Sequence, residues 1–282
     1  TKTSVEESLH QKLLLLFWRY MVVGGMPEVV QAYVDTQNIP TINRIQKRLM
    51  DLYRLDIMQY AGNDEKVKIL DVFNAIPSQL DDKNRRFFLS HLKKTARMER
   101  YEHTFVWLEL AGVGLPCYNV SELQVPLVKN IKRNLFRLYL CDTGLLSSCY
   151  SADIQYEILQ GNVKVNFGSI LENLFAQALR AKELPLFYYD NKRLELDFVV
   201  SMHNKIHLLE IKSGNDYTKH ASLSKVLENE DLPISQGIVF CKSNVMVQNN
   251  ILYLPFYMVM FYENEKVEEF ILSQDIDTLF GL

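Results

Sequence analysis

The stretch LELDFVV at 194–200, followed by LLEIKSG at 208–214, decides the fold of the C-terminal half of this chain. Both segments are rich in apolar residues, and the turn-forming pair His203-Asn204 lies between them, so they predict two strands joined in a hairpin. Residues 206–212 begin apolar on both faces, which is typical of a central strand covered by helices. Glu210 and Lys212 lie at the end of that strand, where desolvation of their charges must be offset by pairing or by a metal.

The surrounding segments predict an α-β-β-β-α-β order. Residues 168–182 form an amphipathic helical pattern, and three short strands are expected to follow it. A second helix and a buried strand come next, and an apolar segment ends the pattern. The expected strands are 186–189, 194–200, 206–212 and 237–241, the second helix is about 217–227, and the apolar segment is 251–262.

Three acidic residues and one lysine are predicted to gather at the hairpin. Glu210 and Lys212 are two residues apart, so they share one face of their strand at a spacing of roughly 6.5–7 Å. Asp197 points away from the apolar side of its own strand and can meet Glu210 across the hairpin. Glu172 lies at the edge of the apolar stripe of the preceding helix. Carboxylate oxygens are the ligands that Mg²⁺ prefers, so these residues predict a site for Mg²⁺ or Mn²⁺.

The first half of the chain is expected to be mainly helical. Apolar residues recur at helical spacing in residues 1–65 and are interrupted at Gly24-Gly25 and Pro27. Three short helical patterns then occur at 67–76, 85–92 and 101–111, and extended patterns follow at 113–120 and 135–139. Three helices followed by a β-ribbon suggest a winged helix.

Basic residues flank this predicted winged helix and are suited to contacts with DNA phosphates. A solvated helix face accounts equally well for the charge pattern. The residues predicted to bind nucleic acid are Arg85, Arg86, Lys93, Lys94, Arg97, Lys132 and Arg133.

Composition limits the class of protein. The chain has 282 residues, with 48% apolar and 23% charged residues, so it is long enough for two domains or three small ones and is not disordered. Thirty-one basic residues against 34 acidic ones exclude a uniformly basic coat, so any nucleic-acid site must be local. No apolar run reaches the ~20 residues that span a bilayer. The cysteine spacing and the lack of a signal-peptide pattern indicate a cytoplasmic protein with free thiols and no membrane contact.

The motif residues carry a resemblance to the PD-(D/E)XK nuclease superfamily. LELDFVV and LLEIKSG, with GSILENLFAQAL at 168–179 upstream, resemble its motifs. The resemblance implies that Asp197 and Glu210 are metal ligands, that Lys212 is the lysine of the E-x-K motif, and that Glu172 is the helix-borne acid. Leu196 stands where the pattern has proline, which is a departure from the family.

A second resemblance covers nearly the whole chain. GGMPEVV at 24–30, IPSQL at 76–80, WLELAGV at 107–113 and RLYLCDTGLL at 137–146 resemble the C-terminal part of a prokaryotic AAA+ ATPase family that carries a nuclease-like domain. No glycine is followed by lysine, so the phosphate-binding loop of an ATPase is not encoded here. The resemblance implies that ATP binding belongs to a preceding ATPase module of the same full-length protein, which would be a partner of this chain.

These observations together predict an α+β or α/β protein of several domains. Residues 1–65 are the helical module, 66–150 the winged-helix-like domain, and 151–282 the restriction-endonuclease-like domain. Two functions stay open: a Mg²⁺-dependent enzyme that hydrolyses DNA phosphodiester bonds, and an inactive nuclease-fold module that binds DNA or a partner protein and regulates the ATPase. In the first, the metal polarises the phosphodiester and Lys212 orients the attacking water. RNA as the substrate and a homo-oligomeric state are compatible with the sequence.

Overall fold

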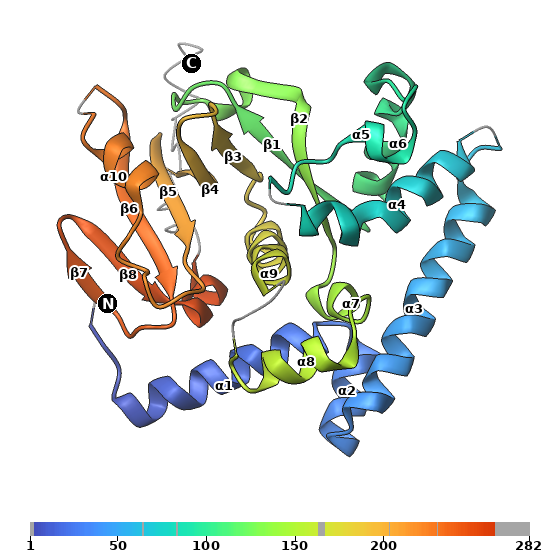
Figure 1. The fold of residues 1–282 in the computed structure, drawn as a ribbon, viewed down its shortest axis with the longest axis horizontal. Helices are drawn as coiled ribbons and strands as arrows, with labels where there is room; N and C mark the ends of the chain where they lie inside the picture. The colour runs from blue at the N-terminus through green and yellow to red at the C-terminus, as the bar shows by residue number, and fades with distance from the viewer. Residues whose placement is uncertain are drawn as a thin grey trace, which may run out of the picture.

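The computed structural model describes residues 3–63, 65–82, 84–162, 167–202, 204–229 and 231–262. It begins with the helices α1 (Glu7–Val23), α2 (Pro27–Thr36) and α3 (Ile39–Tyr60) (Figure 1). Helix α1 ends at Gly24, which adopts a left-handed φ of 75°, and Pro27 lies in the first turn of α2, where a backbone N–H is not needed. The predicted helical start of the chain and its break at the glycine pair are therefore confirmed.

The middle of the chain contains more helices and the first two strands. One expectation here is wrong: the helix predicted at 85–92 begins only at Leu89. Arg85 has a left-handed φ of 49°, and the N–H of Phe87 bonds to the carbonyl of Phe136 on a neighbouring strand (2.9 Å) rather than within a helix. The elements are α4 (Lys66–Asp81), α5 (Leu89–Leu92), the 3₁₀ turn η1 (Met98–Arg100), α6 (Glu102–Leu110), β1 (Gly114–Val120), η2 (Leu127–Asn130), β2 (Ile131–Leu140), α7 (Thr143–Ser147) and α8 (Ala152–Leu159).

The C-terminal part follows the predicted α-β-β-β-α-β order. The apolar segment 251–262 divides at Pro255 into a strand and a 3₁₀ helix, and a three-residue strand that was not anticipated precedes it. The elements are α9 (Phe167–Ala181), β3 (Phe187–Asp190), β4 (Glu195–Met202), β5 (Lys205–Ile211), α10 (Ala221–Leu227), β6 (Ile234–Cys241), β7 (Met246–Gln248), β8 (Ile251–Pro255) and η3 (Phe256–Phe261).

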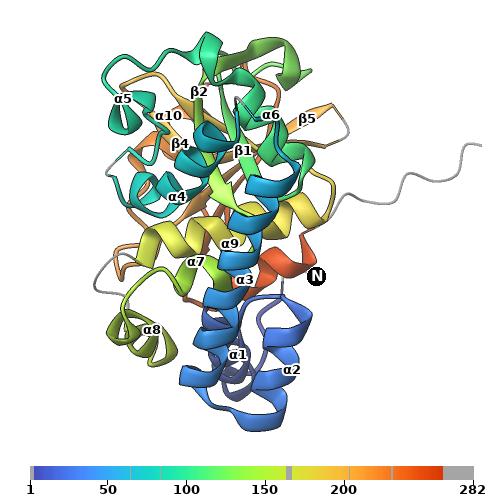
Figure 2. The same cartoon turned by 90° about the vertical axis from the view of Figure 1, so that its right-hand side faces the viewer.

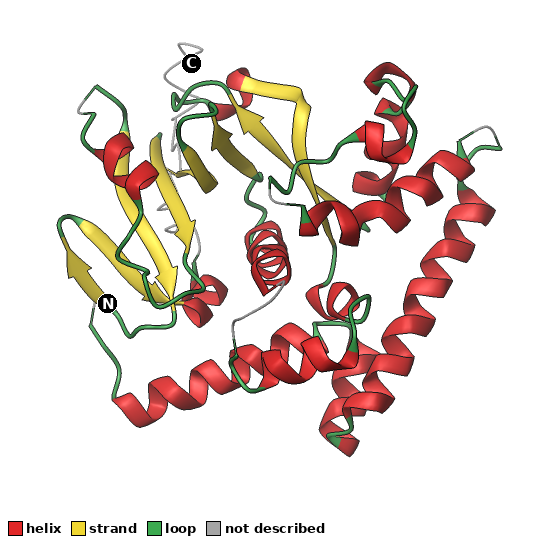
Figure 3. Ribbon diagram, in the orientation of Figure 1, coloured by secondary structure: helices red, strands yellow, loops and turns green. Residues whose placement is uncertain are grey.

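All these strands form one mixed sheet in the order β2-β1-β3-β4-β5-β6-β8-β7. Strands β1 and β2 are the expected antiparallel ribbon, but β1 also pairs in parallel with β3, with Tyr118 opposite Phe187. The ribbon assigned to a winged helix therefore extends the C-terminal sheet, and the predicted boundary at residue 150 does not separate two sheets. The architecture is mixed α+β, with a helical N-terminal part and a C-terminal mixed sheet (Figure 3).

Helices cover the centre of the sheet on both faces. Leu174 and Phe175 of α9 belong to a core that includes Leu209 of β5, whereas Leu223 of α10 belongs to a second core that includes Leu208. Strand β5 is thus buried on both sides, as its sequence predicted. Figure 2 shows α1, α2 and α8 at one end of the molecule, with α3 running from them toward the helices of the middle part.

The glycine pair after α1 lies against the loop that precedes α7. Oδ2 of Asp142 accepts from the N–H of Gly25 at 2.7 Å, and Oδ1 accepts from the N–H of Leu145 at 2.9 Å. One carboxylate therefore closes the end of one helix and caps the start of another. The distant motifs GGMPEVV and RLYLCDTGLL meet at this contact.

Gly144 is a close-approach position in the same contact. A Cβ atom at this residue would lie 2.4 Å from the carbonyl oxygen of Val23. Because that neighbour is backbone, we expect Gly144→Ala to lower the free energy of unfolding by about 1–3 kcal/mol, as overpacking does in other cores.

Urea denaturation measures this loss. Gly62→Ala is the matched control, because a Cβ at Gly62 meets nothing within 4 Å. Equal stability of the two variants would contradict the close packing of α7 on the end of α1.

Within the part of the chain that the structure describes, no helix is both long and apolar enough to cross a membrane.

Candidate active site

A polar pocket of about 440 Å³ lies where α9, β4, β5 and the loop after β5 meet. All four residues predicted from the nuclease-like motifs line it, so their predicted proximity is confirmed. We call it the acidic pocket. Its lining residues are Arg85, Gly168, Leu171, Glu172, Glu195, Asp197, Glu210, Ile211, Lys212, Ser213, Gly214 and Ser222.

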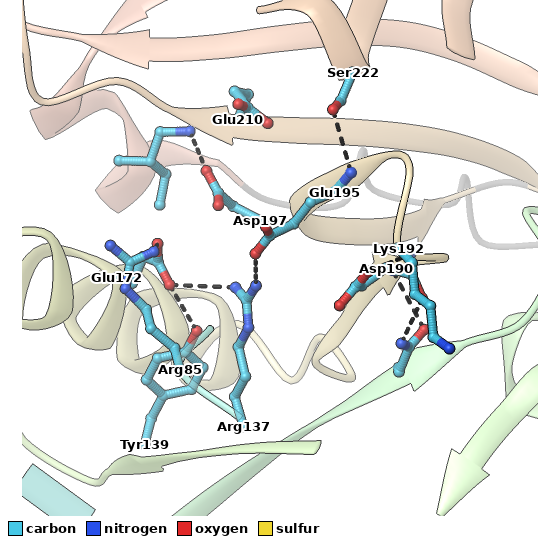
Figure 4. Close-up of polar contacts among 12 residues, drawn as sticks. Arg85, Arg137, Tyr139, Glu172, Asp190, Lys192, Glu195, Asp197, Glu210 and Ser222 are labelled. Carbon is cyan, nitrogen blue, oxygen red and sulfur yellow. Dashed lines mark hydrogen bonds and ion pairs between the residues drawn. The ribbon is translucent and has the colours of Figure 1, made fainter. Parts of the chain in front are cut away.

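The hairpin β4–β5 brings Asp197 and Glu210 together. The strands are antiparallel with Phe198 opposite Leu209, so Asp197 and Glu210 are neighbours across the pair. Oδ2 of Asp197 accepts from the N–H of Ile211 at 2.7 Å, which fixes the position of this carboxylate beside β5. Both residues line the acidic pocket from adjacent strands, and Figure 4 labels them.

Glu210 and Lys212 form an ion pair within this site. Nζ of Lys212 lies 2.7 Å from Oε1 of Glu210, whereas Oε2 of Glu210 is buried without a hydrogen-bond partner among the described residues. Burial and the charge of Asp197 raise the pKa of Glu210 to about 8, and Lys212 acts against that rise. Burial disfavours the charged form of Lys212, but the combined attraction of Glu210, Asp197 and Glu195 outweighs burial and raises the lysine pKa. The pocket thus holds a carboxyl group that lacks one polar partner.

Glu172 is held by three donors. Arg85 pairs with Oε1, and Oε2 lies 3.3 Å from Nη1 of Arg137 and accepts from the hydroxyl of Tyr139 at 3.1 Å. Burial raises the pKa of Glu172, and Arg85 and Arg137 oppose that rise. Both carboxylate oxygens are engaged, so these contacts differ from the metal-ligand role expected for this residue (Figure 4).

Arg137 is a central residue of the site that the sequence analysis did not single out. Its side chain on β2 is fully buried and also pairs with Glu195, at 2.5 Å. The guanidinium lies over the ring of Tyr188, 4.4 Å from its centroid. The available signal was an arginine in the otherwise apolar run FRLYL at 136–140, but its partners Glu172, Tyr188 and Glu195 come from distant segments.

The structure distributes the predicted nucleic-acid-binding residues over different places. Arg85 lines the acidic pocket, and Arg86 lies over the ring of Phe88, 5.4 Å from its centroid. Arg133 lines a separate pocket beside α6. Lys93, Lys94 and Arg97 are exposed in the loop after α5, and Lys132 lies on β2 opposite Asn119.

The acidic pocket offers a cation the carboxylates of Asp197 and Glu210. Within the described ranges, no group of three His, Cys, Asp or Glu side chains is arranged to hold a metal. Mg²⁺ is commonly held by one or two carboxylates and completes its coordination with water and phosphate. Asp197 and Glu210 supply two such carboxylates.

Comparisons with known proteins identify the class of this chain. Residues 14–155 match the profile of a domain of unknown function, DUF8612, and residues 167–258 match a second domain of unknown function, DUF4143. DUF4143 occurs in proteins associated with AAA ATPases. The DUF8612 profile spans half of the chain, so the chain belongs to that family.

The search of curated proteins gave no significant match. Among solved structures, the crystal structure of protein VC1899 from Vibrio cholerae aligns with 92% of this chain, at 10% sequence identity and a TM-score of 0.25. The chain spans 55% of the length of that protein.

Proposed function

We propose that this chain is the C-terminal part of a cytoplasmic AAA+ ATPase-family protein and that its acidic pocket hydrolyses DNA phosphodiester bonds with Mg²⁺ or Mn²⁺. The observation that carries the proposal is the meeting of Asp197, Glu210 and Lys212 in one pocket, at the end of a strand buried on both faces. Charged groups in such a place require a function or a compensating partner. The PD-(D/E)XK resemblance supplies the reaction class.

The residues present fit a divalent cation. Oε2 of Glu210 is buried and has no hydrogen-bond partner among the described residues, so a cation would satisfy an atom that the protein leaves unpaired. Asp197 lines the same pocket from the next strand. Asp197 and Glu210, with the backbone carbonyl of Ile211, would hold the metal. When bound, Mg²⁺ supplies Lewis-acid polarisation of a phosphodiester oxygen.

The chain's own groups have separate roles in this proposal. Lys212 bears the positive charge that orients the attacking water and stabilises charge on the phosphoryl oxygens. The backbone N–H of Ile211 positions Asp197. Glu172 anchors Arg85 and Arg137 rather than contributing a third carboxylate ligand.

The Asp197→Asn variant tests the proposal. We expect it to slow Mg²⁺-dependent cleavage of supercoiled plasmid DNA by roughly 10²–10³-fold or more, because loss of a metal ligand removes several kcal/mol of transition-state stabilisation. The fold should persist, because an amide can still accept from the N–H of Ile211.

Asp51→Asn is the matched control, since Asp51 is an exposed carboxylate on α3 with 71% of its side chain accessible. Plasmid cleavage by the wild-type chain that EDTA does not inhibit, or that survives in Asp197→Asn, would contradict the proposed site.

A second candidate function is a module that binds DNA or a partner protein, regulates the attached ATPase and has no nuclease activity. The ion pairs of Glu172 with two arginines favour it, because they leave one carboxylate fewer for metals. Calorimetric titration with Mn²⁺ separates the candidates: binding that is lost in Asp197→Asn supports the nuclease, and DNA binding without any Mn²⁺ binding supports the regulatory module.

A further inference from the structure

One arginine reaches the acidic pocket from the N-terminal half of the chain. Arg85 lies in the loop between α4 and α5, 87 positions before its ion-pair partner Glu172. Its side chain is 27% exposed and lines the pocket together with Lys212. Arg137, the second arginine at Glu172, is fully buried and does not line the pocket. Of these two arginines, Arg85 is therefore the one that an entering ligand can touch.

Glu172 does not depend on Arg85 alone. Oε2 of Glu172 is held by Arg137 at 3.3 Å and by the Tyr139 hydroxyl at 3.1 Å. A guanidinium has five N–H donors, and Nη1 of Arg85 is the one that bonds to Glu172. Arg85 can therefore turn donors toward a ligand while Glu172 keeps two other partners.

The local backbone is arranged to aim this side chain. Arg85 adopts a left-handed φ of 49°. This backbone conformation is uncommon for arginine and is more readily adopted by asparagine, which precedes it at position 84. Such conformations persist where the surroundings fix them, often at functional sites. Gly168, at the start of α9, leaves space for the guanidinium, because a Cβ there would lie 2.5 Å from Nη2 of Arg85.

Two cationic side chains line the acidic pocket and can contact a phosphate. Four carboxylates (Glu172, Glu195, Asp197 and Glu210) meet three cationic groups (Arg85, Arg137 and Lys212). Glu172 and Glu195 share Arg137, which leaves Arg85 and Lys212 as the cationic groups that line the pocket. A guanidinium fork is well matched to phosphate oxygens, whereas an ammonium acts as a point charge.

We propose that Arg85 is a substrate-contacting residue of the acidic pocket and that it and Lys212 bind the same nucleic-acid phosphate group. The inference rests on the proposed nuclease function for its substrate class. It differs from the expected role of Arg85 in a basic surface beside the winged helix, since the contact is made inside the pocket. It also makes binding at the C-terminal site depend on the position of the α4–α5 loop.

A double-mutant cycle tests the shared phosphate. Binding of a 24-base-pair duplex to the whole chain is measured by fluorescence anisotropy in EDTA over a range of KCl concentrations. We expect Arg85→Asn to weaken binding about tenfold and to make the slope of log affinity against log salt shallower by about one unit, as loss of one phosphate contact does. Asparagine tolerates a left-handed backbone, so the fold is preserved. The double variant Arg85→Asn/Lys212→Gln should also be measured. Its loss of affinity should be at least about twofold smaller than the product of the losses in the two single variants.

Two further variants complete the test. Arg54→Asn, which removes an arginine of α3 that pairs with Asp51, should leave affinity and slope unchanged. Gly168→Ala should weaken binding without changing net charge. Losses from Arg85→Asn and Lys212→Gln that multiply, or an Arg85→Asn variant that binds like the wild type, would overturn the inference. If Arg85→Asn does not fold, the same double-mutant cycle with Arg85→Lys tests the inference. Lysine keeps the positive charge but loses the paired N–H donors of the guanidinium group.

Failure of the inference is distinguishable from failure of the proposed function. Binding in EDTA involves no cleavage, so an inactive site still permits the cycle. A wild-type chain that does not bind the duplex would contradict DNA as the substrate and the inference with it. If the wild-type chain binds DNA and cleaves it with Mg²⁺, but Arg85→Asn binds DNA as tightly as the wild type, only the inference is contradicted.

Discussion

The Glu210→Gln variant is expected to be more stable than the metal-free wild type at pH 8.5, by up to about 5 kcal/mol, while losing Mg²⁺-dependent cleavage. The pKa of Glu210 is raised to about 8 in the folded chain, mainly by burial and by Asp197, whereas a glutamate in an unfolded chain titrates near 4.3. The folded state therefore binds this proton more tightly. Stability from the neutral carboxyl is fully present below about pH 4.3 and is lost as the pH rises through 8. Glutamine stays neutral, so its advantage grows over that window.

Urea unfolding in EDTA at pH 5 and pH 8.5 measures the effect. The difference between Glu210→Gln and the wild type should be small at pH 5 and large at pH 8.5. Added Mg²⁺ should stabilise only the wild type, because ligand binding to the folded state adds to its stability. Glu28→Gln is the control, since Glu28 is an exposed glutamate with 51% of its side chain accessible. A difference between the proteins that does not depend on pH would contradict the raised pKa of the buried Glu210 carboxyl.

Charged residues that lower stability but serve activity stand out in apolar strands, and this is why the site motif could be found from the sequence. Glu210 and Lys212 break the apolar pattern of a strand that is otherwise suited to a core, and Asp197 does the same on the neighbouring strand. Alternation along each strand predicted which side chains share a face, and the turn-forming residues between the strands predicted that the two strands pair. Local patterns therefore predicted the β4–β5 half of the site.

The other half of the site depends on contacts between distant segments. Arg85 was expected on a helix, but its segment bonds to the edge of β2, with Phe87 donating to Phe136. Arg137 stands in a strand whose alternation is equally compatible with an exposed ribbon. The parallel pairing of β1 with β3 is what joins that strand to the C-terminal sheet. No periodicity within β1 or β2 encodes a partner about 70 residues away, so the arginine side of the pocket could not be predicted.

The fold shows the same division. Helices with clear apolar stripes and breaks at Gly24-Gly25 and Pro27 were predicted close to their observed bounds. The three residues of β7 are too few to show a period, and the single continuous sheet arises from pairing across the predicted boundary at residue 150. Sequence patterns thus predicted elements and hairpins, and long-range pairing determined how they combine.

Replacing Arg137 by methionine is expected to lower the free energy of unfolding by about 3–5 kcal/mol. The substitution removes the guanidinium that bridges Glu172 and Glu195 and lies on Tyr188. Glu172 is only 3% exposed, so its carboxylate would remain buried with Arg85 as its one cationic partner among the described residues. Methionine fills much of the volume of the arginine side chain, so the loss of stability results mainly from the disrupted charge network rather than from a cavity. Chemical denaturation at pH 7 measures it.

A second substitution separates the buried charge from packing. The double variant Arg137→Met/Glu172→Leu should recover most of the lost stability, because replacing both partners of a buried ion pair by apolar residues removes the uncompensated charge. Arg44→Met, at an exposed arginine of α3, should change stability by no more than about 0.5 kcal/mol. If the double variant were as unstable as Arg137→Met alone, the role of Arg137 would be packing against Tyr188. Recovery of stability with loss of DNA binding would instead show that Glu172 and Arg137 are kept to hold Arg85 at the acidic pocket, at the expense of a more stable apolar core.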